Sequence, residues 1–92
     1  MVETTLTIRH ALGLHARPAA EFYKKTREFK SRITIQNLSR PGSAKVPVSA
    51  FSLLQSGVKH GHQIRIWAEG EDEQAAIVAL TALVEDNFGE PP

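Results

Sequence analysis

The octapeptide GLHARPAA at residues 13–20 is the feature that most constrains the fold of this chain. The residues before it alternate between apolar and polar, which is typical of a half-buried strand, and the residues after it repeat with helical spacing. The ring of Pro18 fixes its φ near the helical value. Proline has no backbone N–H, and this costs nothing in the first turn of a helix, where the N–H groups have no intrahelical partner. The octapeptide is therefore predicted to join a strand to a helix.

His15 and Arg17 lie at this predicted helix start. The first N–H groups of a helix have no intrahelical partner, and together with the positive end of the helix dipole they attract anions. Imidazole is a nucleophile that is largely neutral at pH 7, and a guanidinium offers a planar set of donors to phosphate oxygens. The pattern predicts that His15 carries a phosphoryl group, which Arg17 and the backbone N–H of Ala16 stabilise.

The octapeptide resembles the active-site signature of HPr, the family of histidine-containing phosphocarriers of the bacterial phosphotransferase system. Residues 68–74, AEGEDEQ, are similar to the start of that family's last helix, and the chain length and element order also fit. The resemblance implies that enzyme I, charged from phosphoenolpyruvate, phosphorylates His15 on Nδ1, and that the group then passes to an enzyme IIA component. A role in sugar uptake and a role in a nitrogen-linked regulatory branch both stay open.

A protein of this kind is a stoichiometric shuttle and not an enzyme, because it releases no net chemical product. Its phosphoacceptor must be exposed, since two different proteins have to reach it in turn. We expect no cofactor, and we expect the site to hold the phosphoryl group only through hydrogen bonds that are worth about 1–3 kcal/mol each.

The rest of the chain predicts one domain over residues 1–92 with the element order βαββαβα. Such alternation makes an α+β fold, an HPr-like open-faced β-sandwich in which a four-stranded antiparallel sheet carries three helices on one face. Trp67 is expected on the open face. By the rule that a residue before proline avoids the α region, the first helix begins after Arg17, whereas by the resemblance it begins at about Ala16. Further elements are predicted at residues 33–35, 44–48, 50–55, 63–68 and 71–84, with a loose tail at 87–92.

Composition excludes several classes of function. A net charge of +1 is no nucleic-acid signature, and the absence of cysteine leaves no disulfide framework and no thiolate metal site. No apolar run approaches the length that spans a membrane. We expect a cytoplasmic monomer that does not insert into a membrane.

Residues 49–54, SAFSLL, occupy the place where HPr proteins carry a regulatory serine followed by an apolar docking patch. The resemblance implies that Ser49 is this serine, a target for a serine kinase/phosphorylase, and that Phe51 and Leu54 form the patch. The residues alone equally predict a helix cap followed by buried side chains. Because Phe51, Leu53 and Leu54 cannot all point one way, we expect Phe51 to be partly exposed and Leu53 to be buried.

The approach to Ser49 departs from the family pattern. The turn at residues 37–43 is longer than usual, Val48 stands where a basic residue commonly precedes the serine, and Pro47 restricts the preceding strand to a sheet edge. These departures weaken the prediction of regulation at Ser49.

Basic residues gather after the start of the first helix and suit an acidic protein partner, although a solvated helix face explains them equally well. We expect Lys24 and Arg27 to contribute to docking, within a cluster that comprises Lys24, Lys25, Arg27, Lys30 and Arg32.

Two other functions compete with the phosphocarrier. The order βαββαβ is also that of RNA-binding RRM domains, but those need aromatic residues on the central strands, and only Trp67 could serve. A hydrolase with a nucleophilic His15 needs an acid or base to activate water, and the octapeptide holds no carboxylate.

The remaining histidines are not predicted to bind a metal. His60 and His62 flank Gly61, but two imidazoles without a third ligand nearby make a poor zinc site. His10 is predicted to be a loop residue rather than a ligand.

Overall fold

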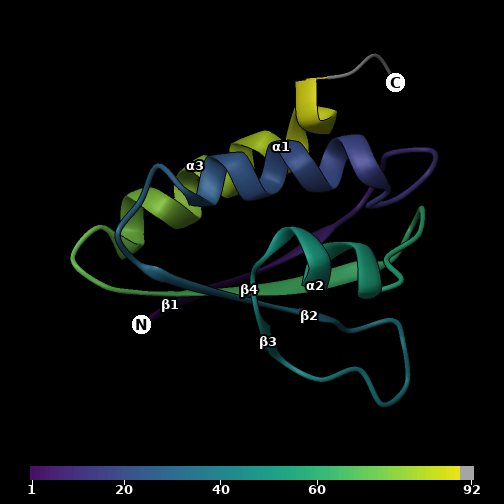
Figure 1. Ribbon diagram of the computed structural model, residues 1–92, viewed down its shortest axis with the longest axis horizontal. Helices are drawn as coiled ribbons and strands as arrows, with labels where there is room; N and C mark the ends of the chain where they lie inside the picture. The colour runs from purple at the N-terminus through teal and green to yellow at the C-terminus, as the bar shows by residue number, and fades with distance from the viewer. Residues whose placement is uncertain (90–92) are drawn as a thin grey trace.

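The computed structural model describes residues 1–89 of the chain (Figure 1). It confirms the predicted order βαββαβα and adds a short 3₁₀ turn, η1, after the last helix. The elements are β1 (Val2–Thr7), α1 (Ala16–Thr26), β2 (Arg32–Asn37), β3 (Val46–Pro47), α2 (Ala50–Gln55), β4 (Gln63–Glu69), α3 (Glu73–Glu85) and η1 (Asn87–Gly89).

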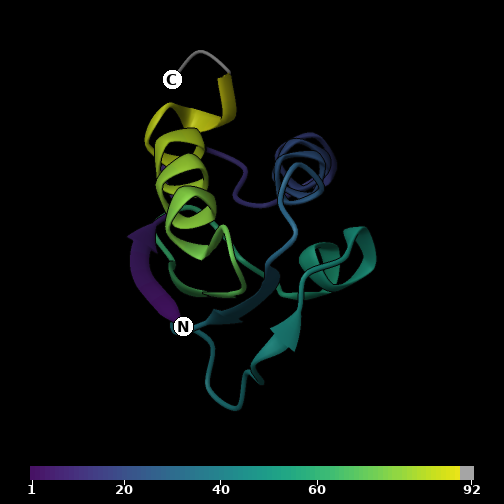
Figure 2. The same ribbon diagram turned by 90° about the vertical axis from the view of Figure 1, so that its left-hand side faces the viewer.

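The four strands form one antiparallel sheet in the order β1-β4-β2-β3. Figure 2 shows α1 and α3 over one face of this sheet, with α2 beside them toward β3. The other face carries no helix of the described chain, so the predicted open-faced sandwich is confirmed.

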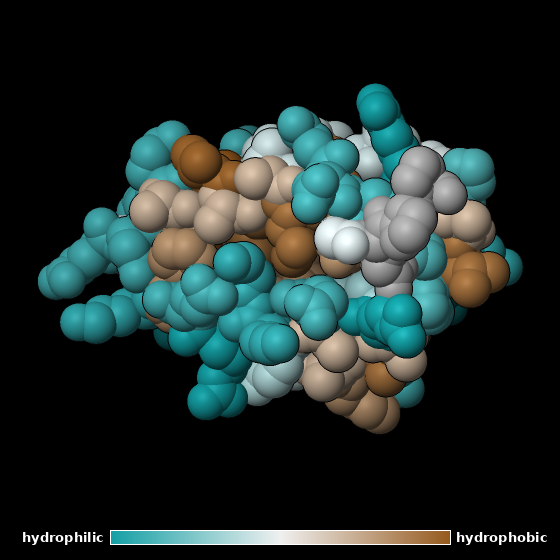
Figure 3. Space-filling model, turned by 90° about the horizontal axis from the view of Figure 1, so that it is seen from above, coloured by the Kyte–Doolittle hydropathy of each residue, from teal (hydrophilic) through white to brown (hydrophobic). Residues whose placement is uncertain are grey.

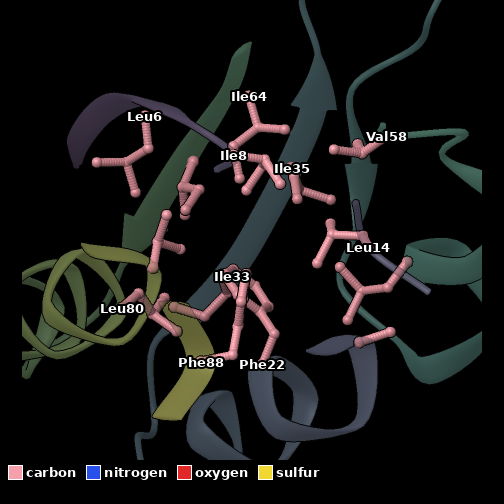
Figure 4. Packing of buried hydrophobic residues seen from close by; sticks show 14 of the residues in the cluster. Leu6, Ile8, Leu14, Phe22, Ile33, Ile35, Val58, Ile64, Leu80 and Phe88 are labelled. Atoms are coloured by element: carbon pink, nitrogen blue, oxygen red, sulfur yellow. The ribbon is translucent and has the colours of Figure 1, made fainter. Parts of the chain in front are cut away.

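The core lies between the sheet and the helices. The side chains of β4 alternate as a half-buried strand requires, and Ile64, Ile66 and Ala68 are fully buried against the helices. Figure 4 shows Phe22 of α1 and Leu80 of α3 gathering with the buried isoleucines of the sheet. Burial of each large apolar side chain stabilises the fold by about 1.5–3 kcal/mol.

The third strand is shorter than predicted. Residues 44–48 were expected to be extended, but only Val46 and Pro47 pair with β2. Because Pro47 has no N–H to donate, β3 lies at the edge of the sheet, and the chain leaves it after the amide of Val48 donates to the carbonyl of Ile33 at 3.0 Å.

The prediction of a loose tail is wrong for residues 87–89, and the rest of that tail lies outside the described residues. Phe88 is buried to 4% exposure, although its φ of 59° is costly for a residue with a side chain. Burial of its ring in the core offsets that cost.

The last helix begins at Glu73, later than predicted, because the side chain of Asp72 binds residues 30–31. Its carboxylate accepts hydrogen bonds from the Ser31 hydroxyl and from the backbone N–H groups of Ser31 and Lys30, at 2.9 and 2.8 Å. These bonds, with that of the Ser31 hydroxyl foremost, lower the pKa of Asp72. They tie the start of α3 to the chain between α1 and β2.

Candidate functional site

Residues 8–15, here named the His15 loop, connect β1 to α1 and are fixed to residues 58–62. Backbone bonds between Ile8 and the 61–62 turn hold one end of the loop, at 2.8 and 2.9 Å, and the amide of Leu14 donates to the carbonyl of Val58 at 3.0 Å near the other end. Gly13 adopts a φ of +70°, and a Cβ at this position would lie 2.3 Å from the Val58 oxygen. Only glycine satisfies both the conformation and the space.

The helix starts at the position that the resemblance implies. His15 is the N-cap of α1 in an extended conformation, and its carbonyl accepts the amide of Ala19 at 2.9 Å. The rule for residues before proline is wrong here, because Arg17 is helical. Pro18 is only the third helical residue, so its missing N–H removes no helical hydrogen bond. The amides of Ala16 and Arg17 likewise precede the first i→i−4 bond.

The His15 side chain makes no capping hydrogen bond and is half-buried rather than fully exposed. Its Nε2 is buried and has no hydrogen-bond partner among residues 1–89. The imidazole is therefore placed with Nε2 inward.

Arg17 is exposed at the second position of α1. The first turn of this helix carries no acidic side chain, so no carboxylate of that turn offsets the positive end of the helix dipole. His15, the Ala16 amide and Arg17 are thus brought together, as the sequence indicates.

His10 belongs to this site and was missed by sequence reasoning. It lies in a loop, as predicted, but it is only 8% exposed, and its ring centroid is 4.9 Å from that of His15. Its other ring neighbour is Phe88, at 6.2 Å. The contact between His10 and Phe88 joins a loop to residues 87–89 at the far end of the sequence, so no periodicity signals it.

The α2 segment confirms the predicted cap and the predicted exposures. Ser49 is the N-cap, and its Oγ accepts the Ser52 amide at 3.0 Å while the Ser52 Oγ accepts the Ser49 amide at 2.9 Å. Phe51 is 68% and Leu54 52% exposed, whereas Leu53 is fully buried. Figure 3, seen from the helical side, shows a group of apolar residues at the lower edge, where α2 lies. We name Phe51 and Leu54 the α2 patch.

Lys24 and Arg27 lie toward the other end of α1, roughly 13–18 Å from His15 along the helix axis. Both are exposed, and both have neighbours within the helix. Lys24 is 4.0 Å from Glu21, and the Arg27 Nη1 donates to the Tyr23 hydroxyl at 3.1 Å. They do not touch the His15 loop, so any docking role would depend on a partner that covers the length of α1.

His62 has a structural place in the described chain. Its Nδ1 accepts the Lys59 amide at 3.1 Å and lies 3.3 Å from the Asn37 Nδ2. Residues 1–89 contain no group of three or more histidine, cysteine or acidic residues that could hold a metal ion. His60 is exposed.

Trp67 faces outward from β4, and the Lys45 ammonium lies 4.3 Å from its ring centroid. Within the described sheet its neighbours in register are Glu3 and Thr34, and no second aromatic side chain faces outward from the strands. This arrangement lacks the stacking platform of an RNA-binding sheet. No helix among the described residues is both long and apolar enough to cross a membrane.

Comparison with known proteins identifies the relatives of this chain. A family model described as "PTS HPr component phosphorylation site" matches residues 2–86. The phosphocarrier protein HPr of Borreliella burgdorferi is 40% identical over 85 residues, which cover 92% of this chain and 95% of that protein. A crystal structure of HPr from Thermoanaerobacter tengcongensis superposes with a TM-score of 0.89 at 39% identity and covers 100% of both chains.

A second kind of relative is much longer. The multiphosphoryl transfer protein of Haemophilus influenzae is 41% identical over 86 residues, which are 94% of this chain but 17% of that protein. This chain therefore spans less than a fifth of the length of that relative.

Proposed function

Because this chain belongs to the HPr family of phosphotransferase-system phosphocarriers, we propose that it accepts a phosphoryl group on Nδ1 of His15 and passes it on. The observation that supports this site best is the placement of the imidazole. Its Nε2 is buried, and the ring sits at the N-terminus of α1 beside the exposed Arg17.

In the proposed reaction the Nδ1 lone pair attacks the phosphorus and a P–N bond forms, while the bond between phosphorus and the donor breaks and its electron pair returns to the donor. The amides of Ala16 and Arg17 and the Arg17 guanidinium donate to the phosphoryl oxygens. Each such bond is worth about 1–3 kcal/mol, which is enough to hold the group in transit without making its departure slow. Transfer to the acceptor runs the same steps in reverse, so the protein is a carrier and not an enzyme.

The donor in this proposal is enzyme I and the acceptor is an enzyme IIA component. The exposed α2 patch would supply apolar contacts, and Lys24 and Arg27 would face acidic side chains of the partner. Support comes from the half-exposure of His15, which lets successive proteins reach one ring. We propose a cytoplasmic monomer that acts in sugar uptake, with a nitrogen-linked regulatory branch as the alternative.

We also propose phosphorylation of Ser49, which fewer observations support. Its hydroxyl already accepts the Ser52 amide, so modification by a serine kinase/phosphorylase would replace this cap with a phosphate. A phosphate at a helix N-terminus is electrostatically tolerated, and its charge would lie beside the α2 patch.

The function is tested by incubating the protein with labelled phosphoenolpyruvate and enzyme I, and then adding an enzyme IIA component. We expect an acid-labile label on the wild type that leaves when the acceptor is added. Immediate release of inorganic phosphate would indicate a hydrolase, and no labelling at all would reject the carrier function.

A further inference from the structure

A hollow of about 470 Å³ lies where the turn after β2 meets the chain that leads from α2 to β4. It is lined by Ser39, Arg40, Pro41, Gly57, Lys59 and His62. None of these residues belongs to the His15 loop, to α1 or to the α2 patch, so the hollow is separate from the proposed phosphoacceptor site. Its volume is in the range of hollows that bind small molecules.

The polar side chains of this hollow have unused hydrogen-bond donors. The Arg40 Nη1 donates to the carbonyl of Gln55 at 3.3 Å, and the other N–H groups of the guanidinium have no partner in the described chain. The Ser39 Oγ accepts the amide of Gln63 at 2.9 Å, so its own hydrogen stays available. The Lys59 ammonium forms no hydrogen bond or ion pair with the described residues.

The tautomer of His62 adds a further donor. Its Nδ1 accepts the Lys59 amide at 3.1 Å and lies 3.3 Å from the Asn37 Nδ2. The latter is also a donor, since the Asn37 Oδ1 accepts the Ser39 amide at 3.0 Å. A neutral imidazole whose Nδ1 accepts an N–H carries its proton on Nε2. This Nε2–H has no partner in the described chain.

The Arg40 guanidinium is held in place before any ligand arrives. Besides its bond to Gln55, it occupies space that Gly57 leaves open, because a Cβ at Gly57 would lie 2.9 Å from the Arg40 Nη1. A side chain that is already ordered loses less conformational entropy when it binds a ligand.

The charges around the hollow favour an anion. Residues 29–68 contain no Asp or Glu but six Lys or Arg, which are Lys30, Arg32, Arg40, Lys45, Lys59 and Arg65. Neither cation that lines the hollow, Arg40 or Lys59, forms an ion pair with the described residues. An anion in the hollow would therefore meet positive charges that no carboxylate neutralises.

We propose that this hollow binds a small organic phosphate ester, whose phosphate accepts hydrogen bonds from Arg40, Lys59 and His62. A phosphate monoester carries about 1.5–2 negative charges at pH 7 and has three terminal oxygens that accept hydrogen bonds. A site with unused donors and two free cations matches such a group. The volume of the hollow leaves room for an organic part beside the phosphate. This inference goes beyond the proposed function and does not depend on it.

Titration of the wild type with glycerol 3-phosphate, followed by NMR, tests the site at an ionic strength held constant with sodium chloride. We expect the amide signals of Gly57 and Lys59 and the ring signals of His62 to shift along saturable curves with a common midpoint. The amides of Ala16 and Arg17 report separately on any binding at the start of α1. A parallel titration with inorganic phosphate distinguishes the ester from the free ion.

Variants with matched controls test the lining residues. Lys59→Met and Arg40→Gln should each weaken binding by roughly five- to tenfold, because each removes a charge-assisted donor. His62→Asn keeps an acceptor but removes the Nε2–H, so it should weaken binding by roughly two- to fivefold. Lys45→Met and Arg32→Gln remove the same charges from exposed positions outside the hollow and should leave the midpoint unchanged.

Shifts at Gly57 and Lys59 that rise without saturation, or equal losses in Lys59→Met and Lys45→Met, would overturn the site, because they indicate only general attraction of anions to a basic region. Binding of inorganic phosphate with exclusion of glycerol 3-phosphate would overturn the ligand class. A protein that binds the ester here but is not labelled by enzyme I rejects only the carrier function. A labelled protein without saturable shifts at the hollow rejects only this site.

Discussion

The His15 loop is fixed by backbone hydrogen bonds to residues 58–62, whereas α2 is fixed by a serine cap at one end and by the buried Leu53 beneath it. The first arrangement places a single half-buried ring at the start of α1. The second leaves two large apolar side chains, Phe51 and Leu54, in solvent. Chemistry needs a group that does not move, while docking needs apolar area that a partner can cover. We therefore expect substitutions in the two regions to separate transfer from binding.

His15→Ala should have the largest effect, because it removes the only proposed phosphoacceptor. We expect transfer from enzyme I to vanish, while the free energy of unfolding changes by no more than about 1 kcal/mol, since the ring is half-buried. Label incorporation and thermal unfolding are the two measurements. Incorporation close to that of the wild type would place the phosphoryl group elsewhere.

Gly13→Ala should break the anchor of the His15 loop. Its Cβ would clash with the Val58 oxygen and force a φ of +70° on alanine, so we expect a loss of about 2–4 kcal/mol of stability together with slower transfer. The matched control is Gly42→Ala, which has a φ of +78° but no atom within 4 Å of the added Cβ. It should cost only about 1 kcal/mol in denaturant titrations. Equal losses would show that the contact with Val58 is unimportant.

Arg17→Ala should slow phosphoryl transfer by roughly ten- to a hundredfold, because a charge-assisted donor to the phosphoryl group is lost. Arg17→Lys should be intermediate, since an ammonium cannot present the same planar fork. Arg65→Ala, which removes an arginine from the open face of the sheet, is the control and should transfer at the wild-type rate. Rapid-quench kinetics with enzyme I measures all four proteins. Indistinguishable rates would argue against phosphate contact by Arg17.

Phe51→Ala should weaken the binding of enzyme I by about 1–2 kcal/mol and leave the fold intact, because Phe51 is exposed. Val78→Ala removes an apolar side chain of similar exposure from α3 and should not change binding. Ser49→Asp keeps a good N-cap residue but adds a charge beside the α2 patch, so it should also weaken binding. Calorimetric titration compares them. Unchanged affinity for Phe51→Ala would remove the α2 patch from the interface, and unchanged affinity for Ser49→Asp alone would remove only the regulatory serine.

The smallest effect that we predict is the pH dependence of stability that comes from Asp72, which lies outside the His15 loop and α2. Hydrogen bonds from Ser31 and Lys30 hold the pKa of Asp72 below its ordinary value, so its contribution to stability is complete above the pKa of the unfolded chain and is lost as the pH falls through the folded-state pKa. We expect the melting temperature of the wild type to fall more than that of Asp72→Asn between about pH 5 and pH 2.5. Glu71→Gln, at an exposed neighbour, should behave like the wild type. Parallel curves for all three proteins would contradict the assignment.

The sequence predicts what depends on local pattern and misses what depends on distant contacts. Alternation and turn residues predict the strands, and the octapeptide predicts the juxtaposition of His15, Ala16 and Arg17 because they are neighbours in the chain. Asp72 was expected inside a helix, because its bonds to Ser31 cannot be read from spacing. His10 and Phe88 were not recognised as partners, since 78 residues separate them and no periodicity links a loop to a tail.

The central claim is that Nδ1 of His15 carries the phosphoryl group, and the most direct test is the product that enzyme I and phosphoenolpyruvate form on the wild-type protein. Mass spectrometry under alkaline conditions counts the phosphoryl groups, and two-bond ¹H–¹⁵N spectra identify the nitrogen. We predict one group per chain, on Nδ1 of His15, which disappears when an enzyme IIA component is added. A group on Nε2, on another histidine or on Ser49 would contradict the account.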